Sequence, residues 1–208
     1  MSPKLRNLFI VAVAASFIIL MGSRIIFGSR SFDPDTVAEA ETQMWKAYYT
    51  RDKMELGMQI ITLLRGQYGL SFGDAKKIGE KLARTSMKFA GTRGDYDKVV
   101  LPDLIEVYTM IRDAGDESFD PEAAARAELA WWVARRTPGE NSVEQVGDKI
   151  AELYAILYGH EDPAFKTAGH LRAKAAALRD AGGKNADWDK IEKLLKESYS
   201  KLAEAVDD

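Results

Sequence analysis

Apolar side chains recur every three or four residues along most of the chain from residue 32 onward, which is the spacing of one helical face. Near the C-terminus, Ile191, Leu195 and Tyr199 share such a face, while Lys193 and Glu197 fall largely away from it. No stretch shows the sustained apolar and polar alternation of half-buried strands. The pattern predicts an all-α fold, a compact multi-helix bundle of about seven helices.

Short polar patterns mark where these helices begin. Aspartate before proline places a hydrogen-bond acceptor at the N-cap and a fitting residue at the first helical position. Serine with an acidic or amide residue three positions later is typical of a capping box. The pairs are Asp33-Pro34, Asp120-Pro121 and Asp162-Pro163, and the serine patterns are Ser71 with Asp74 and Ser142 with Gln145.

The first predicted helix, residues 35–68, is unusually long. Glycine weakens a helix by about 1 kcal/mol relative to alanine. We therefore expect a break or bend near Gly57.

Residues 1–31 differ in composition from the rest of the chain. Lys4 and Arg6 precede an apolar run, and residues 8–28 would form about 31 Å of helix, enough to cross a bilayer core. We predict an N-terminal membrane anchor at residues 1–31, contacting the membrane through residues 8–28, and an all-α globular domain at residues 32–208. A cleaved signal peptide is the alternative, although no small-residue cleavage site follows the apolar core.

Charge and composition narrow the function classes. The net charge of -3 does not favour a nucleic-acid partner. The chain has no cysteine, which excludes disulfides, thiolate metal sites and cysteine nucleophiles. Its two histidines, His160 and His170, lack the Glu-x-x-His spacing of a di-iron bundle. We expect no metal, no cofactor and no catalytic residue. Composition and motifs together favour a protein that is not an enzyme.

The pattern Ala-Glu-x-x-x-Trp occurs twice, with Glu41 before Trp45 and Glu128 before Trp132. Both glutamates fall on apolar, aromatic helical faces, where carboxylates are rarely buried without partners. One interpretation is that they meet across two helices as an acid/base or metal-binding pair. The favoured interpretation is that each accepts hydrogen bonds from an arginine or an indole and orders the packing. Arg84, Arg126 and Arg135 are the candidate partners.

Aromatic residues near these glutamates could line a pocket for an apolar or planar ligand, although aromatic residues at helical spacing usually form core. The candidate residues for a cofactor or ligand site are Glu41, Trp45, Tyr48, Glu128 and Trp132.

Four segments together resemble an uncharacterised group of bacterial helical proteins over residues 37–203. They are Glu41-x-x-x-Trp45-x-x-Tyr48-Tyr49, Leu63-Leu64-Arg65-x-Gln67-Tyr68, Phe119-Asp120-Pro121 leading to Glu128-Leu129-x-Trp131-Trp132, and Leu171-Arg172-Ala173-x-Ala175-x-Ala177-Leu178-Arg179. The resemblance implies no activity, ligand or functional residue.

Three hypotheses follow. The first is a single-pass protein of the bacterial inner membrane, an accessory or scaffold subunit that binds another protein of a membrane-associated assembly. Its free amino terminus weakly favours placing the domain outside the cytoplasm. The second is an enzyme or a cofactor- or metal-binding domain that uses Glu41 and Glu128. The third is a carrier of a lipid or another small hydrophobic ligand.

Overall fold

The computed structural model describes residues 32–50 and 52–206. These residues form nine α-helices, one short 3-10 helix and no strand, which confirms the all-α fold. The predicted anchor at residues 1–31 lies outside the described residues. Among the described helices, none combines the length and the apolar character needed to span a membrane.

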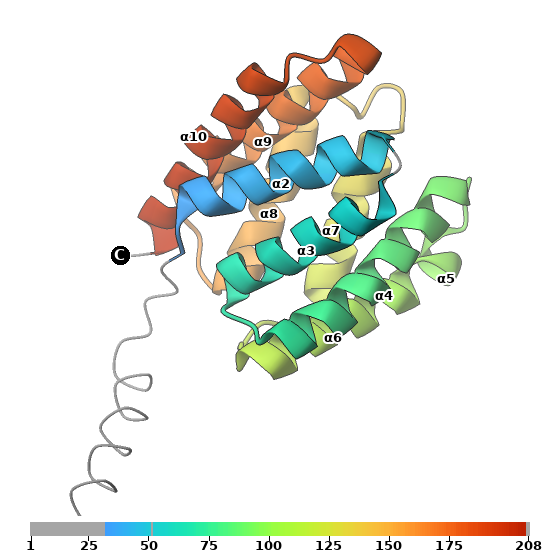
Figure 1. The fold of residues 1–208 in the computed structure, drawn as a ribbon, viewed down its shortest axis with the longest axis vertical. Coiled ribbons are helices and arrows are strands. Elements are labelled where there is room, and N and C mark those ends of the chain that lie inside the picture. The colour runs from blue at the N-terminus through green and yellow to red at the C-terminus, as the bar shows by residue number, and fades with distance from the viewer. Residues whose placement is uncertain (1–31, 51, 207–208) are drawn as a thin grey trace, which may run out of the picture. The chain divides into compact units, whose positions relative to one another are not determined.

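The helices follow one another closely along the chain (Figure 1). In order they are α2 (Pro34–Thr50), α3 (Lys53–Tyr68), α4 (Phe72–Gly91), α5 (Tyr96–Val99), α6 (Leu101–Gly115), α7 (Pro121–Ala134), α8 (Val143–Tyr158), α9 (Pro163–Gly182), η1 (Gly183–Asn185) and α10 (Trp188–Val206).

The eight long helices close into a ring. From α2 to α4 and from α6 to α10, each long helix packs against the next one along the chain. Helix α4 also packs against α6, with the short α5 on the side of α6, and α10 packs against α2. Figure 1 shows α2 lying beside α10 although they are the first and last described helices. This closure encloses an interior that all eight helices share.

The count of about seven helices was too low for two local reasons. The predicted helix at residues 35–68 is two helices, because α2 ends at Thr50 and α3 begins at Lys53, and the division does not fall near Gly57. Asp52 begins α3 as its N-cap, because its side chain accepts a hydrogen bond from the backbone N–H of Glu55. Gly57 stays inside α3, and the four-residue α5 accounts for the other extra helix.

The predicted helix starts are confirmed. Helices α2, α7 and α9 begin at the prolines of the three Asp-Pro pairs. Ser142 and Gln145 form a complete capping box at the start of α8. Ser71 caps α4 by accepting a hydrogen bond from the Asp74 N–H.

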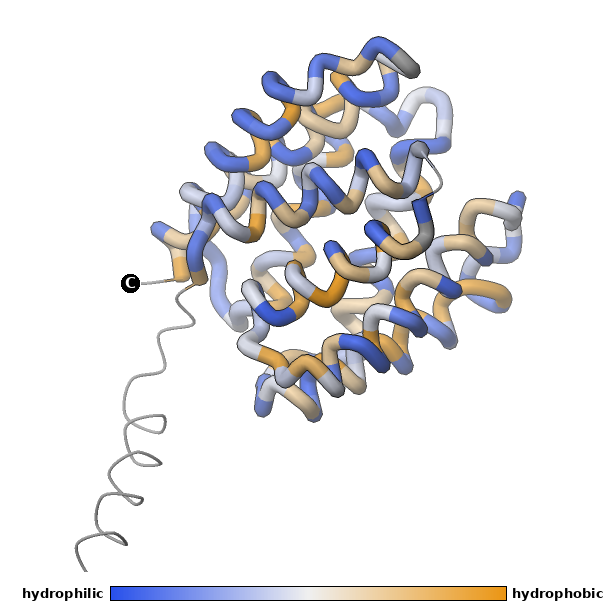
Figure 2. The backbone as a smooth tube through the Cα atoms, in the orientation of Figure 1, coloured by the Kyte–Doolittle hydropathy of each residue, from blue (hydrophilic) through white to orange (hydrophobic). Residues whose placement is uncertain are grey.

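The helices at the front of the view carry both hydrophilic and hydrophobic positions (Figure 2), as expected for helices with one face toward an interior. Helices α8 and α9 approach most closely at two glycines. A Cβ on Gly169 would lie 2.3 Å from the Gly147 carbonyl oxygen, and a Cβ on Gly147 would lie 2.8 Å from the His170 Cα. Only residues without a side chain fit this crossing, which fixes α9 against α8.

Candidate functional site

A cavity of about 470 Å³ lies inside the ring, and all eight long helices contribute to its wall. Apolar and aromatic side chains make up most of the lining. The charged lining residues are Glu41, Glu128, Arg135, Arg136, Arg172 and Asp180. All five candidates selected from the sequence also line it: Glu41, Trp45, Tyr48, Glu128 and Trp132.

The cavity opens where α2, α4, α7 and α9 end, since the most exposed lining residues lie there. Tyr48 and Tyr49, at the end of α2, are each 40% exposed, and Met87 in α4 is 60% exposed. At the same end Arg135 follows α7 and pairs with Asp180 of α9 at 2.8 Å. Trp45 and Trp132 are partly buried. These aromatic residues therefore pack against the core and line the cavity at once.

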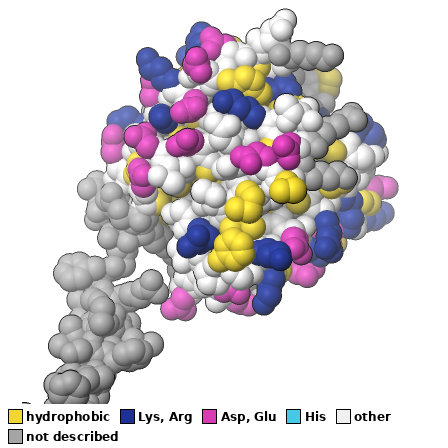
Figure 3. Space-filling view, viewed as in Figure 1, with side chains coloured by type: hydrophobic (Ala, Val, Ile, Leu, Met, Phe, Trp, Pro, Cys, Tyr) yellow, Lys and Arg dark blue, Asp and Glu magenta, His cyan; other side chains and the backbone are white. Residues whose placement is uncertain are grey.

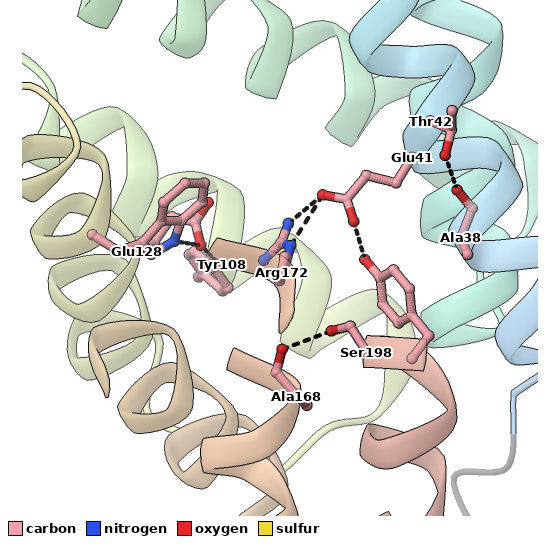
Figure 4. Close-up of polar contacts among 10 residues, drawn as sticks. Ala38, Glu41, Thr42, Tyr108, Glu128, Ala168, Arg172 and Ser198 are labelled. Atoms are coloured by element: carbon pink, nitrogen blue, oxygen red, sulfur yellow. Dashed lines mark hydrogen bonds and ion pairs between the residues drawn. The ribbon is translucent and has the colours of Figure 1, made fainter. Parts of the chain in front are cut away.

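Glu41 is completely buried, and both of its carboxylate oxygens accept hydrogen bonds. Arg172 of α9 donates from Nε and from its terminal NH2 group to Glu41 Oε1, at 3.0 and 2.6 Å. The Tyr199 hydroxyl of α10 donates to Oε2 at 2.8 Å. Glu41 has no accessible surface. It therefore ties α2 to α9 and α10 from within (Figure 4).

The ion pair with Glu41 stabilises the positive charge on Arg172. Burial disfavours the charged guanidinium, but Glu41, together with Tyr154 and Tyr199, outweighs burial and raises the pKa of Arg172 well above its usual value. Arg172 therefore stays a cation and is the direct counter-ion of Glu41.

Glu128 has a different set of partners. Tyr108 of α6 and the indole N–H of Trp131 both donate to its Oε2, each at 3.0 Å. Both donors are neutral. Burial raises the pKa of Glu128, and the nearby Arg172 opposes that shift without cancelling it. Glu128 keeps part of its surface accessible while lining the cavity.

The two glutamates do not form a carboxylate pair. Arg172 lies between them, with its guanidinium directed at Glu41 and 5.3 Å from the Trp131 ring (Figure 4). The favoured sequence interpretation agrees with this geometry, because Glu41 bonds an arginine and Glu128 bonds an indole.

None of the three arginines predicted as partners of the glutamates bonds to Glu41 or Glu128. Arg84 lies near Glu80, Arg126 pairs with Glu122, and Arg135 pairs with Asp180. The residue that fills it, Arg172, is on the face of α9 that also carries the buried Ala168 and Ala176, and this spacing was the available signal.

The two histidines take structural positions. Nδ1 of His160 lies 3.2 Å from the Tyr158 carbonyl oxygen, and its Nε2 lies 3.0 Å from that of Ala205. His170 Nε2 lies 2.8 Å from Asp148. Throughout residues 32–50 and 52–206, no three His, Asp or Glu side chains are grouped to hold a metal ion.

Comparisons with known proteins return no relative for this chain: no family model, no curated protein and no solved structure matches it.

Proposed function

We propose that this domain binds a small, largely apolar organic molecule in the central cavity, as a carrier or receptor for that ligand. The observation that carries the proposal is the cavity of about 470 Å³ with residues of all eight ring helices in its wall. Ligand sites in proteins are typically about 300–1,000 Å³, mostly apolar, with a few polar groups that orient the ligand. The lining here has that composition.

A void of this size is costly unless something fills it. Protein interiors are packed about as densely as organic crystals and contain few voids larger than one water molecule. Losing contacts around a cavity destabilises a protein by roughly 24 cal/mol per Å³ in mutated cores. A fold that keeps such a space accessible through an opening at one end is therefore better explained by a ligand than by packing alone.

The first sequence hypothesis, a scaffold that binds another protein, remains a second proposal with its own support. Met54, Met58 and Phe72 are 83%, 50% and 52% exposed, on α3 and at the start of α4. Figure 3 shows apolar side chains among charged ones on this face. Contiguous exposed apolar patches rimmed by polar residues are typical of contact surfaces.

The enzyme alternative has weaker support. The acid/base pair of that hypothesis needs Glu41 and Glu128 to share a site, whereas Glu41 is committed to Arg172 and Tyr199.

The cavity proposal is tested by filling the cavity. Ala83 of α4 lines it, so Ala83→Phe places a ring in the ligand space. Ala177→Phe on the exposed face of α9 is the matched control. The full-length chain of each is purified gently from its host and examined by native mass spectrometry after release from detergent.

We expect a bound small molecule on the wild type and on Ala177→Phe, reduced at least about tenfold on Ala83→Phe, since overfilling a ligand site excludes the ligand. The same occupancy in all three proteins would contradict the cavity as the binding site.

A further inference from the structure

The cavity lining carries three carboxylates and three guanidiniums, but they are not paired one to one, and this bears on what the ligand is. Glu41, Glu128 and Arg172 lie together in the wall, two carboxylates with one guanidinium. Arg172 gives two hydrogen bonds to Glu41 and none to Glu128. With both carboxylates ionised, this cluster carries one negative charge without a direct counter-ion.

The polar groups around Glu128 satisfy its hydrogen bonds without neutralising its charge. Tyr108 and Trp131 donate to one oxygen, Oε2. A buried carboxylate is expensive to keep ionised unless a cation pairs with it. Glu128 also keeps accessible surface on the cavity, whereas Glu41 keeps none. Of the two glutamates, Glu128 is therefore the one that a ligand can reach.

Aromatic rings surround the same space. The rings that line the cavity together with Glu128 include Trp45, Tyr48, Tyr68, Tyr108, Trp131 and Trp132. Aromatic faces attract cations, most strongly where water is excluded, and proteins bind quaternary ammonium groups in such cages. An apolar body carrying a positive charge would satisfy both the rings and the carboxylate.

Three arginines lie toward the mouth of the cavity, and each already has a partner. Arg135 is paired with Asp180. Arg136 donates to the Phe89 carbonyl oxygen at 2.8 Å. The Arg179 guanidinium lies 3.1 Å from the centre of the Tyr49 ring. Arg135 has its own carboxylate, whereas Arg136 and Arg179 contact a carbonyl oxygen and a ring, and none of these contacts is with Glu128.

Resting on the cavity function proposed above, we propose that the ligand is an apolar cation, an amine or quaternary ammonium on an apolar body, whose charge binds against Glu128 and the surrounding aromatic rings. An anionic ligand is disfavoured because it would add a second unpaired negative charge beside Glu128. A neutral ligand would leave the existing one unpaired.

Three probes of similar length test the charge: decyltrimethylammonium, 1-decanol and decanoate. Trp45, Trp131 and Trp132 line the cavity and are three of the four tryptophans, so their fluorescence reports binding. The full-length chain in lipid nanodiscs is titrated with each probe. Titrations of empty nanodiscs correct both the free probe concentration and any fluorescence change of the nanodisc scaffold protein.

We expect decyltrimethylammonium to bind wild type about tenfold or more tighter than 1-decanol, with decanoate weakest. Glu128→Gln keeps an oxygen acceptor for Tyr108 and Trp131 but removes the charge, and should weaken binding of the cation about tenfold while changing 1-decanol less than about twofold. Glu122→Gln, on the exposed face of the same helix, is the matched control and should change neither.

The wild-type ranking tests the proposal even if the Glu128 variant fails to fold. Equal binding of the cation and 1-decanol, or tighter binding of decanoate, would overturn the preference for a cation and leave the cavity function standing. If no probe binds and Ala83→Phe leaves the mass spectrum unchanged, both proposals are overturned.

Discussion

Glu41 and Glu128 occupy the same position of the same short pattern on two helices of one ring, but their surroundings differ in charge. Glu41 has a cation and a hydroxyl as partners and no accessible surface. Glu128 has neutral donors, among them Tyr108 and Trp131, and keeps accessible surface while lining the cavity. The difference teaches that a counter-ion pairs the charge of a buried carboxylate, whereas neutral hydrogen-bond donors leave that charge able to pair with a ligand.

This comparison separates a structural glutamate from one that can meet a ligand. If it is correct, disturbing the partners of Glu41 should mainly change the stability of the ring. Changing Glu128 should mainly change ligand binding and the response to pH.

The largest expected effect is from Arg172→Met, which leaves Glu41 buried without its cation. Breaking one side of a buried ion pair costs about 3–5 kcal/mol. We expect the free energy of unfolding to fall by that amount, measured by chemical denaturation of the full-length chain.

Two further variants serve as references for this loss. Arg126→Met removes an exposed pair with Glu122 and should cost less than about 1 kcal/mol. The double variant Glu41→Leu/Arg172→Met should recover much of the loss, since replacing both ions with apolar groups is often tolerated. A loss for Arg172→Met no larger than for Arg126→Met would break the comparison.

The next largest effect is the loss of stability when the hydroxyl of Tyr199 or of Tyr108 is removed. Tyr199→Phe leaves Glu41 Oε2 without its donor in a site with no accessible surface, and should cost about 1.5–3 kcal/mol of stability. Tyr108→Phe leaves Trp131 on Glu128 and should cost about 0.5–1.5 kcal/mol. Denaturation curves of the two variants measure the difference, and a larger loss for Tyr108→Phe would reverse the assigned roles.

The smallest effect is on pH dependence. Burial raises the pKa of Glu128 above its usual 4.5, so the folded chain holds this proton more tightly than the unfolded chain. Its contribution to stability is present below that value and is lost as pH rises through the folded pKa. Glu128→Gln removes this loss, and should therefore become more stable relative to ligand-free wild type as pH increases from about 4.5.

The groups around Glu128 do not obscure this measurement. The pKa values of Arg172, Tyr108 and Tyr68 all lie well above their usual values, so none of them titrates between about pH 4 and 8. Melting temperatures across that range give the trend. A difference between variant and wild type that does not change with pH, or that falls, would contradict the shift.

Local features of the fold could be predicted from the sequence. The Asp-Pro pairs set the starts of three helices, because the aspartate acceptor and the proline act on their own first turn. The end of α2 at Thr50 and the start of α3 at Lys53 were missed. Gly57 was expected to weaken the long helix, whereas the Asp52 cap, also a local signal, starts a new one.

The site could be predicted only in part. Glu41 and Glu128 were selected because a carboxylate on an apolar face needs a partner. The identity of that partner depends on which helices meet, and the closure of α10 on α2 has no short-range signal. For this reason Arg172 and Tyr199 were not assigned to Glu41, and the shared cavity could not be distinguished from a packed core.

The contact of α2 with α9 and α10 also has a consequence for the order in which the helices fold during synthesis. The partners of Glu41 lie 131 and 158 residues away along the chain, whereas those of Glu128 lie 20 and 3 residues away. Contacts this distant form late, because the intervening chain must first be made and brought back. We expect a nascent chain that ends before α10 to hold an open arc of helices, and the cavity to gain its closed wall only after the last helix leaves the ribosome.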